Sequence, residues 1–218
     1  MTESGDTKTV AVVDPFWNGH HPTYFKAFCD SLLRRGARVI ALCPRPEELP
    51  LPGPGERDRI YCAALPDPGD SRFFKNNSND PIRTVQRWLW LRTALRDAEQ
   101  ESGWKSDLVF FAWLDSYLKF MPPGGLVDRV LSRPWAGLYF HCPHLKTWEA
   151  NGGTALDSVK VVGKGDLLLR SDGCRGVGTL DEEMEPVLRK LSGKTVIPFP
   201  DVTDESDPDP GHPLYLRV

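Results

Sequence analysis

Short apolar runs alternate with segments of helical spacing along most of this chain, and this alternation constrains the fold most strongly. Each run is rich in valine, isoleucine, leucine and aromatic residues and is apolar on both faces, as in strands that helices cover on both sides. The pattern predicts an α/β fold, a doubly wound, mostly parallel sheet of about seven strands with helices on both faces, Rossmann-like in organisation. The predicted strands cover residues 9–14, 38–43, 59–63, 108–112, 136–141, 166–170 and 195–198.

Helical spacing is clearest directly after the first run. Phe25, Phe28 and Leu32 repeat at helical intervals, and Gly36 stands where a helix is expected to end. A strand, a helix and a second strand therefore form a complete β-α-β unit. The predicted helices cover residues 22–35, a long segment from Pro81, residues 126–131 and 155–162, and a segment after the capping-box pattern Thr179-x-x-Glu182.

Chain length and the distribution of proline predict one domain followed by a linker. A domain typically has about 100–250 residues, so 218 residues fit a single core. Residues 1–199 are predicted to form this Rossmann-like domain. Residues 200–218 are acidic and rich in proline, and we expect them to be a linker toward a carboxyl-terminal domain that the chain lacks.

Charge and cysteine content exclude several classes of protein. The net charge of −3 provides no basic surface for a phosphate backbone, so nucleic acid is not an expected partner. Five cysteines without a Cys-x-x-Cys pattern suggest neither a disulfide framework nor a zinc knuckle, and they fit a reducing cytoplasm. The polar first residues and the absence of a long apolar run predict a cytoplasmic protein, with any membrane contact peripheral at the inner face.

The composition of the long predicted helix raises the question of membrane binding. Arginines alternate with Trp88 and Trp90 in the long helix that begins at Pro81, as in helices that lie on anionic membranes. The two tryptophans are not on one helical face, so one of them must pack inward or against a neighbour. We therefore favour an ordinary helix that covers the sheet.

Sequence fingerprints of nucleotide cofactors and of hydrolases are missing. The glycine loop after the first strand matches neither G-x-G-x-x-G nor G-x-x-x-x-G-K-[ST], which disfavours NAD, FAD and P-loop nucleotides. No G-x-S-x-G nucleophile elbow occurs, so an unrelated Rossmann-like hydrolase or reductase is a remote alternative. No cofactor is predicted.

The loop after the first strand is the first candidate site. Ligands of open parallel sheets bind beyond the carboxyl ends of the strands, where the strand order reverses. Gly19 permits a tight turn there, and the following helix presents free N–H groups to an anion or a sugar hydroxyl. Gly19, His20 and His21 are therefore predicted to bind the acceptor or a phosphate.

Two later strands bring further polar side chains to the same edge. The fourth ends near Asp115 and the fifth near His141 and His144. Histidine is suited to general-base work, and a neighbouring carboxylate can orient it, so we predict His141 and Asp115 as the catalytic pair and His144 as a binding residue. Two alternatives stay open: hydrogen-bonding loop histidines, and a less favoured zinc site at His141, Cys142 and His144, whose spacing matches no standard site.

The segment VAVVDPFWNGHHPTYFKAFCDSLLRRGARVIALCP resembles the opening of retaining GT-B glycosyltransferases of the group 1, family 4-like kind. By this resemblance Gly19 and His20 match the glycine loop that approaches acceptor and donor phosphates, and His141 matches a histidine that lines the sugar site. The segment VIPFPDVTD resembles the strand that crosses into the family's carboxyl-terminal domain. Asn18-Gly19-His20 departs from the usual paired glycines, and the domain with the family's basic pair and acidic residue is not in this chain.

The resemblance implies the acceptor-side domain of an enzyme that transfers a sugar from a nucleotide-sugar donor to a carbohydrate or lipid-linked acceptor with retention. Donor binding would require the domain that this chain lacks, so the isolated chain is expected to be inactive. The alternative is a stand-alone, non-catalytic module that binds a sugar or a nucleotide. Fold analogy does not fix the donor, the acceptor or the linkage.

Overall fold

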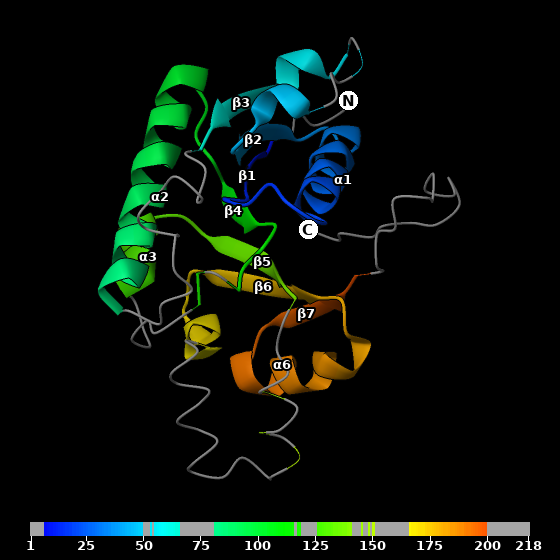
Figure 1. Ribbon diagram of the computed structural model, residues 1–218, viewed down its shortest axis with the longest axis vertical. Coiled ribbons are helices and arrows are strands. Elements are labelled where there is room, and N and C mark those ends of the chain that lie inside the picture. The colour runs from blue at the N-terminus through cyan, green and yellow to red at the C-terminus, as the bar shows by residue number, and fades with distance from the viewer. Residues whose placement is uncertain are drawn as a thin grey trace, which may run out of the picture.

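The computed structural model describes residues 7–49, 53, 55–65, 81–115, 117–118, 126–140, 145, 148, 150 and 166–199. Within these residues, seven strands form one parallel sheet in the order β3-β2-β1-β4-β5-β6-β7 (Figure 1). The predicted doubly wound, Rossmann-like α/β fold is therefore confirmed.

The strands are β1 (Thr9–Val13), β2 (Arg38–Cys43), β3 (Ile60–Ala64), β4 (Leu108–Phe111), β5 (Trp135–Tyr139), β6 (Cys174–Thr179) and β7 (Thr195–Pro198). The α-helices with described bounds are α1 (His21–Arg34), α2 (Pro81–Ser102), α3 (Leu126–Leu131) and α6 (Glu185–Ser192). Short 3-10 turns are η1 (Pro46–Glu48), η2 (Arg57–Arg59), η3 (Asp166–Arg170) and η4 (Glu182–Met184). The predicted helix over residues 155–162 and the predicted linker over 200–218 lie outside the described residues.

Helices cover both faces of the sheet, which explains why its strands are apolar throughout. On one face, α1 packs Phe25 and Phe28 against alternate residues of β1, β2 and β4. On the other face, α2, α3 and α6 cover the intervening residues of the same strands and of β6 and β7 (Figure 1). Trp88 of α2 is fully buried, which confirms that one of the two tryptophans packs inward.

Two predicted features in the second half are wrong. Residues 166–170 form the 3-10 turn η3, and its Leu168 and Leu169 are buried in the core without joining the sheet. The strand at this position is instead β6, whose sequence CRGVGT carries too few apolar residues to show the strand pattern. One reason for its glycines is space: a Cβ on Gly178 would lie only 2.6 Å from Cε2 of Phe199.

The predicted capping box at Thr179 is also wrong. Thr179 is the last residue of β6, and the cap of the following 3-10 turn is Asp181, whose Oδ1 accepts a hydrogen bond of 3.1 Å from the N–H of Glu183. Pro186 lies in the first turn of α6, where a missing N–H is tolerated. The helix ends at Gly193 in the left-handed region with φ 68°.

A half-buried ion pair lies at the end of the sheet where strands β4 and β5 begin. Arg133 donates to Glu99 from Nη2 at 2.8 Å and from Nε at 3.2 Å, and the N–H of Ser106 donates to the same carboxylate at 2.8 Å. Burial alone would raise the pKa of Glu99, but these hydrogen bonds outweigh it and lower the pKa. The pair thus links the end of α2 to the segments that enter β4 and β5.

Replacing Glu99 by glutamine is expected to lower the free energy of unfolding at neutral pH by about 3 kcal/mol, because Arg133 loses its counter-charge. Since folding lowers the pKa of Glu99, its contribution is present above the unfolded value near 4.5 and is lost as the pH falls through the folded value. Urea unfolding at several pH values checks this, with the exposed Glu182→Gln as the control. If the difference in free energy of unfolding between the wild type and Glu99→Gln did not become smaller in acid, the proposed contribution of the Glu99 charge would be contradicted.

Candidate functional site

The sheet has one topological switch point, between β1 and β4. From β1 the strand order runs outward through β2 and β3 on one side and through β4 to β7 on the other. At such a point the loops after the two central strands diverge and leave room for a ligand. The loop from β1 into α1 and the loop after β4 therefore border the expected binding edge.

A buried aspartate and a histidine form a pair at this edge. Asp14 directly follows β1 and is fully buried, and Nδ1 of His21, the first residue of α1, lies 2.8 Å from its Oδ2. The other carboxylate oxygen accepts a hydrogen bond of 2.9 Å from the N–H of Phe16. Only 11% of the His21 side chain is exposed, so its orientation is set by these contacts.

The chemistry of this pair follows from the hydrogen bonds. An ionised carboxylate can only accept, so with Asp14 ionised the contact requires a proton on Nδ1 of His21, and in the neutral imidazole of that tautomer Nε2 carries the lone pair. Burial raises the pKa of the Asp14 carboxyl, while the hydrogen bonds from His21 and Phe16 oppose the increase. The arrangement is an imidazole oriented by a buried carboxylate.

Aromatic rings enclose the imidazole of His21. The Trp113 ring, from the loop after β4, lies 4.0 Å from it between centroids, and Phe16 lies 5.2 Å away. Trp113 in turn stacks on Phe140, which follows β5, at 3.9 Å with an interplanar angle of 18°. The loops after three strands thus contribute to one continuous cluster around His21.

The structure places four of the six predicted site residues. Gly19 adopts φ 57°, which agrees with its predicted turn, and His20 is exposed immediately before α1. His21 contacts the carboxylate of Asp14. Asp115 accepts a hydrogen bond of 3.0 Å at Oδ2 from the N–H of Phe140, so it ties the loop after β4 to the end of β5.

His141 and His144 lie outside the described residues, so the predicted catalytic pair of His141 and Asp115 stays a prediction. The alternative zinc site, which needs His141 and Cys142, also falls outside them. Among the residues that the structure describes, no cluster of three or more His, Cys, Asp or Glu side chains is arranged to hold a metal ion. Within the same residues, no helix is long and apolar enough to cross a membrane.

Sequence reasoning missed Asp14. The first predicted strand includes it because it directly follows four apolar residues, Val10–Val13, and the prediction gives its carboxylate no partner. A signal was present, because a buried strand that ends in an aspartate, followed by a histidine at the start of the next helix, places both at one edge of the sheet. The seven-residue separation in sequence hid their contact.

Comparisons with known proteins identify the fold. No family model matches the sequence, and no curated protein matches it significantly. Structural neighbours are GT-B glycosyltransferases at high probability. UDP-glucose:anthocyanidin 3-O-glucosyltransferase in complex with UDP has a TM-score of 0.54 at 13% identity, over 94% of this chain and 56% of that one.

Two further neighbours agree. UGT2 of Phytolacca americana, complexed with UDP-2fluoro-glucose and pterostilbene, has a TM-score of 0.53 at 12% identity, over 93% of this chain and 55% of that one. UGT89C1 of Arabidopsis thaliana complexed with UDP has a TM-score of 0.51 at 13% identity, over 93% of this chain and 51% of that one. The chain thus spans about half the length of these neighbours. At such identities the likeness establishes the fold, so the chain has the Rossmann-like fold found in these GT-B glycosyltransferases.

Proposed function

We propose that this chain is the acceptor-binding domain of a glycosyltransferase, in which His21 takes the proton from the acceptor hydroxyl. The observation that carries the proposal is the contact between His21 and the buried Asp14 at the topological switch point. The glycosyltransferase fold of the structural neighbours supports it independently. The acceptor is a hydroxyl compound, and the carbohydrate or lipid-linked class stays a prediction.

In the proposed reaction, Nε2 of His21 accepts the hydroxyl proton as the acceptor oxygen bonds to the anomeric carbon of the donor. The bond from that carbon to the diphosphate breaks, and the diphosphate leaves with the bonding electrons. Asp14 stabilises the imidazolium that results, because its carboxylate lies at Nδ1. General-base assistance of this kind contributes roughly 10²–10⁴-fold in rate.

The donor is expected to be a nucleotide sugar that a second, donor-binding domain holds opposite this edge. UDP and a UDP-sugar analogue are bound in the neighbours, so UDP-sugars are the first donors to test. A base that acts directly on the acceptor favours a single displacement, which inverts the anomeric centre. The resemblance to a retaining family predicts retention, and NMR of the product's anomeric proton separates the two.

The competing proposal is a non-catalytic module that binds a sugar or a nucleotide. Both functions use the same edge of the sheet, but only the glycosyltransferase needs an oriented base. Calorimetry with UDP, together with a transfer assay from UDP-glucose to a panel of alcohols by the full protein encoded by the gene, separates them. Tight UDP binding by residues 1–218 without any transfer would favour the binding module.

Replacing Asp14 by asparagine tests the role of the pair without changing its size. The amide can donate to Nδ1 and so favour the wrong tautomer of His21, and we expect transfer to fall by roughly 10³-fold. The fall is expected in kcat, because the pair acts on the reacting proton. A change in KM with kcat unchanged would contradict the proposed role.

Stability provides the control for this variant. Because folding raises the pKa of Asp14, this carboxyl favours the folded state below the unfolded value near 3.8, and that contribution is lost as the pH rises through the folded value. Asp14→Asn is therefore expected to unfold at the same temperature as the wild type, or at a higher one, at pH 7. A strongly lowered unfolding temperature would assign Asp14 a structural role instead.

A further inference from the structure

The indole of Trp113 lies against the imidazole of His21. The two ring centroids are 4.0 Å apart with an interplanar angle of 32°, so the faces of the rings are in contact. The ring of Phe140 lies 3.9 Å from the same indole at an angle of 18°. Two rings so close to one indole, and so nearly parallel to it, cannot share a face. His21 and Phe140 therefore lie on opposite faces of Trp113.

The backbone on either side of Trp113 fixes the position of the indole. The N–H of Ala112 donates to the carbonyl of Val13, the last residue of β1, at 3.0 Å. The N–H of Leu114 donates to the carbonyl of Leu138 in β5 at 2.9 Å. Ala112 and Leu114 are fully buried. Trp113 is thus held between two residues that are bonded to two different strands.

Phe140, on the other face of the indole, is anchored from two sides. Its N–H donates to Oδ2 of Asp115 at 3.0 Å, and its ring contacts Tyr24 of α1 edge to face at 4.9 Å. Tyr24 follows His21 by three residues in α1, so both ends of the stack contact the same helix. The stack of His21, Trp113 and Phe140 is therefore braced at both ends.

We propose that Trp113 is a positioning residue for His21, an inference that rests on the proposed role of His21 as the base. The contact of Nδ1 with Asp14 fixes one atom of the imidazole and leaves rotation about that hydrogen bond. The indole face blocks this rotation and keeps Nε2 in one direction. After proton transfer the same face stabilises the imidazolium, because an indole attracts a cation within about 6 Å of its ring centroid. Both effects act on proton transfer, so they belong to kcat and not to KM.

Two substitutions separate the aromatic face from mere filling of space. Trp113→Leu fills part of the space without a ring, and we expect it to lower kcat about 10- to 100-fold in the full protein encoded by the gene, with KM unchanged. Trp113→Phe keeps an aromatic face and is expected to restore kcat to within about threefold of the wild type. A phenylalanine variant as slow as the leucine variant, or a change in KM alone, would overturn the proposal.

Motion of the imidazole is measured without turnover, in residues 1–218. ¹³C relaxation of the Cε1–H group of His21 gives an order parameter for the ring, which we expect at about 0.85 in the wild type and at about 0.6 or lower in Trp113→Leu. An equal order parameter in the two proteins would overturn the proposal, even where His21→Ala abolishes transfer. Equal transfer rates from the wild type and His21→Ala would instead contradict the proposed function, and the order parameter would still decide whether Trp113 holds the imidazole.

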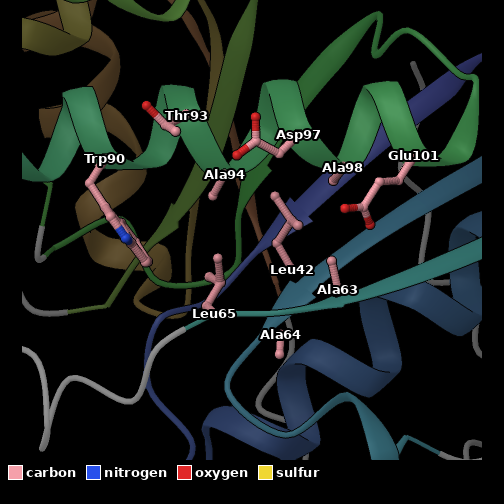
Figure 2. Close-up of a pocket in the computed structure, with 10 residues that line it drawn as sticks. All are labelled: Leu42, Ala63, Ala64, Leu65, Trp90, Thr93, Ala94, Asp97, Ala98 and Glu101. Carbon is pink, nitrogen blue, oxygen red and sulfur yellow. The ribbon is translucent and has the colours of Figure 1, made fainter.

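Trp90→Leu is the matched control for the loss of an indole. Trp90 of α2 is also half-buried, and it lines a hollow between α2 and β3 (Figure 2). Neither His21 nor any ring that contacts it lines this hollow. We expect Trp90→Leu to change neither kcat nor the order parameter of His21. Equal changes in Trp90→Leu and Trp113→Leu would overturn the proposal.

Thermal unfolding of each variant shows whether it is folded under the assay conditions. If Trp113→Leu unfolds there, Trp113→Met repeats the comparison, because an unbranched side chain fills more of the space of the indole and still offers no ring. The methionine variant is expected to show the same loss of kcat and the same increase in ring motion. Wild-type values of both in a folded Trp113→Met protein would overturn the proposal.

Discussion

Replacing His21 by alanine is expected to reduce sugar transfer by roughly 10²–10⁴-fold in the full protein encoded by the gene, because the acceptor hydroxyl loses its proton acceptor. The effect should fall on kcat, since the lost interaction acts in the transition state. Steady-state rates of UDP release from UDP-glucose, with product identified by mass spectrometry, measure it.

A suitable control lies on the same helix. Arg34 is exposed at the other end of α1, and Arg34→Ala is expected to leave kcat unchanged. The folded state of His21→Ala should persist, because the core residues of α1 remain, and thermal unfolding verifies this. An unchanged kcat in a folded His21→Ala protein would remove His21 as the base and return attention to the predicted pair of His141 and Asp115.

Replacing Trp88 by alanine is expected to destabilise the domain by about 3–5 kcal/mol, the largest stability effect that we predict. The indole is fully buried, its N–H donates to the carbonyl of Tyr117 at 3.1 Å, and its ring contacts Phe111 and Trp135. Alanine would leave a cavity between α2 and the sheet and an unsatisfied carbonyl.

Leu89 is the matched control, because it is the next residue of α2 and its side chain is 44% exposed. Leu89→Ala is expected to change the free energy of unfolding by no more than about 0.5 kcal/mol. Urea unfolding of both variants checks the comparison. If Leu89→Ala were as destabilising as Trp88→Ala, the assignment of the buried and exposed faces of α2 would be wrong. The alternative of a membrane-facing helix would then return.

Strong local patterns explain why most of the sheet could be predicted. β2 and β7 match their predicted bounds, and β1, β3, β4 and β5 differ by one or two residues, because buried parallel strands are apolar on both faces. The exception, β6, lies between β5 and the edge strand β7, and Gly176 and Gly178 leave it with little apolar character. The leucines of residues 166–170 misled the prediction, since a short buried turn and a short buried strand have the same composition.

The site was predicted less completely than the fold. The binding edge of the sheet and the loop around Gly19 can be predicted, because the alternation of strands and helices and the position of Gly19 are visible in the local sequence. The contact of His21 with Asp14 cannot, because it depends on the direction of the Asp14 side chain at the end of β1 and on the position of His21 at the start of α1. Likewise, nothing in the sequence indicates that Trp113 lies between His21 and Phe140, because these contacts join the start of α1 to the segments after β4 and β5.

The most direct test of the central claim is a transfer assay with radiolabelled UDP-glucose and a panel of alcohols, using the full protein encoded by the gene and its His21→Ala variant. The account predicts a labelled glycoside from the wild type and a rate lower by roughly 10²-fold or more from the variant. No glycoside from any of several UDP-sugars, or equal rates from the two proteins, would contradict it.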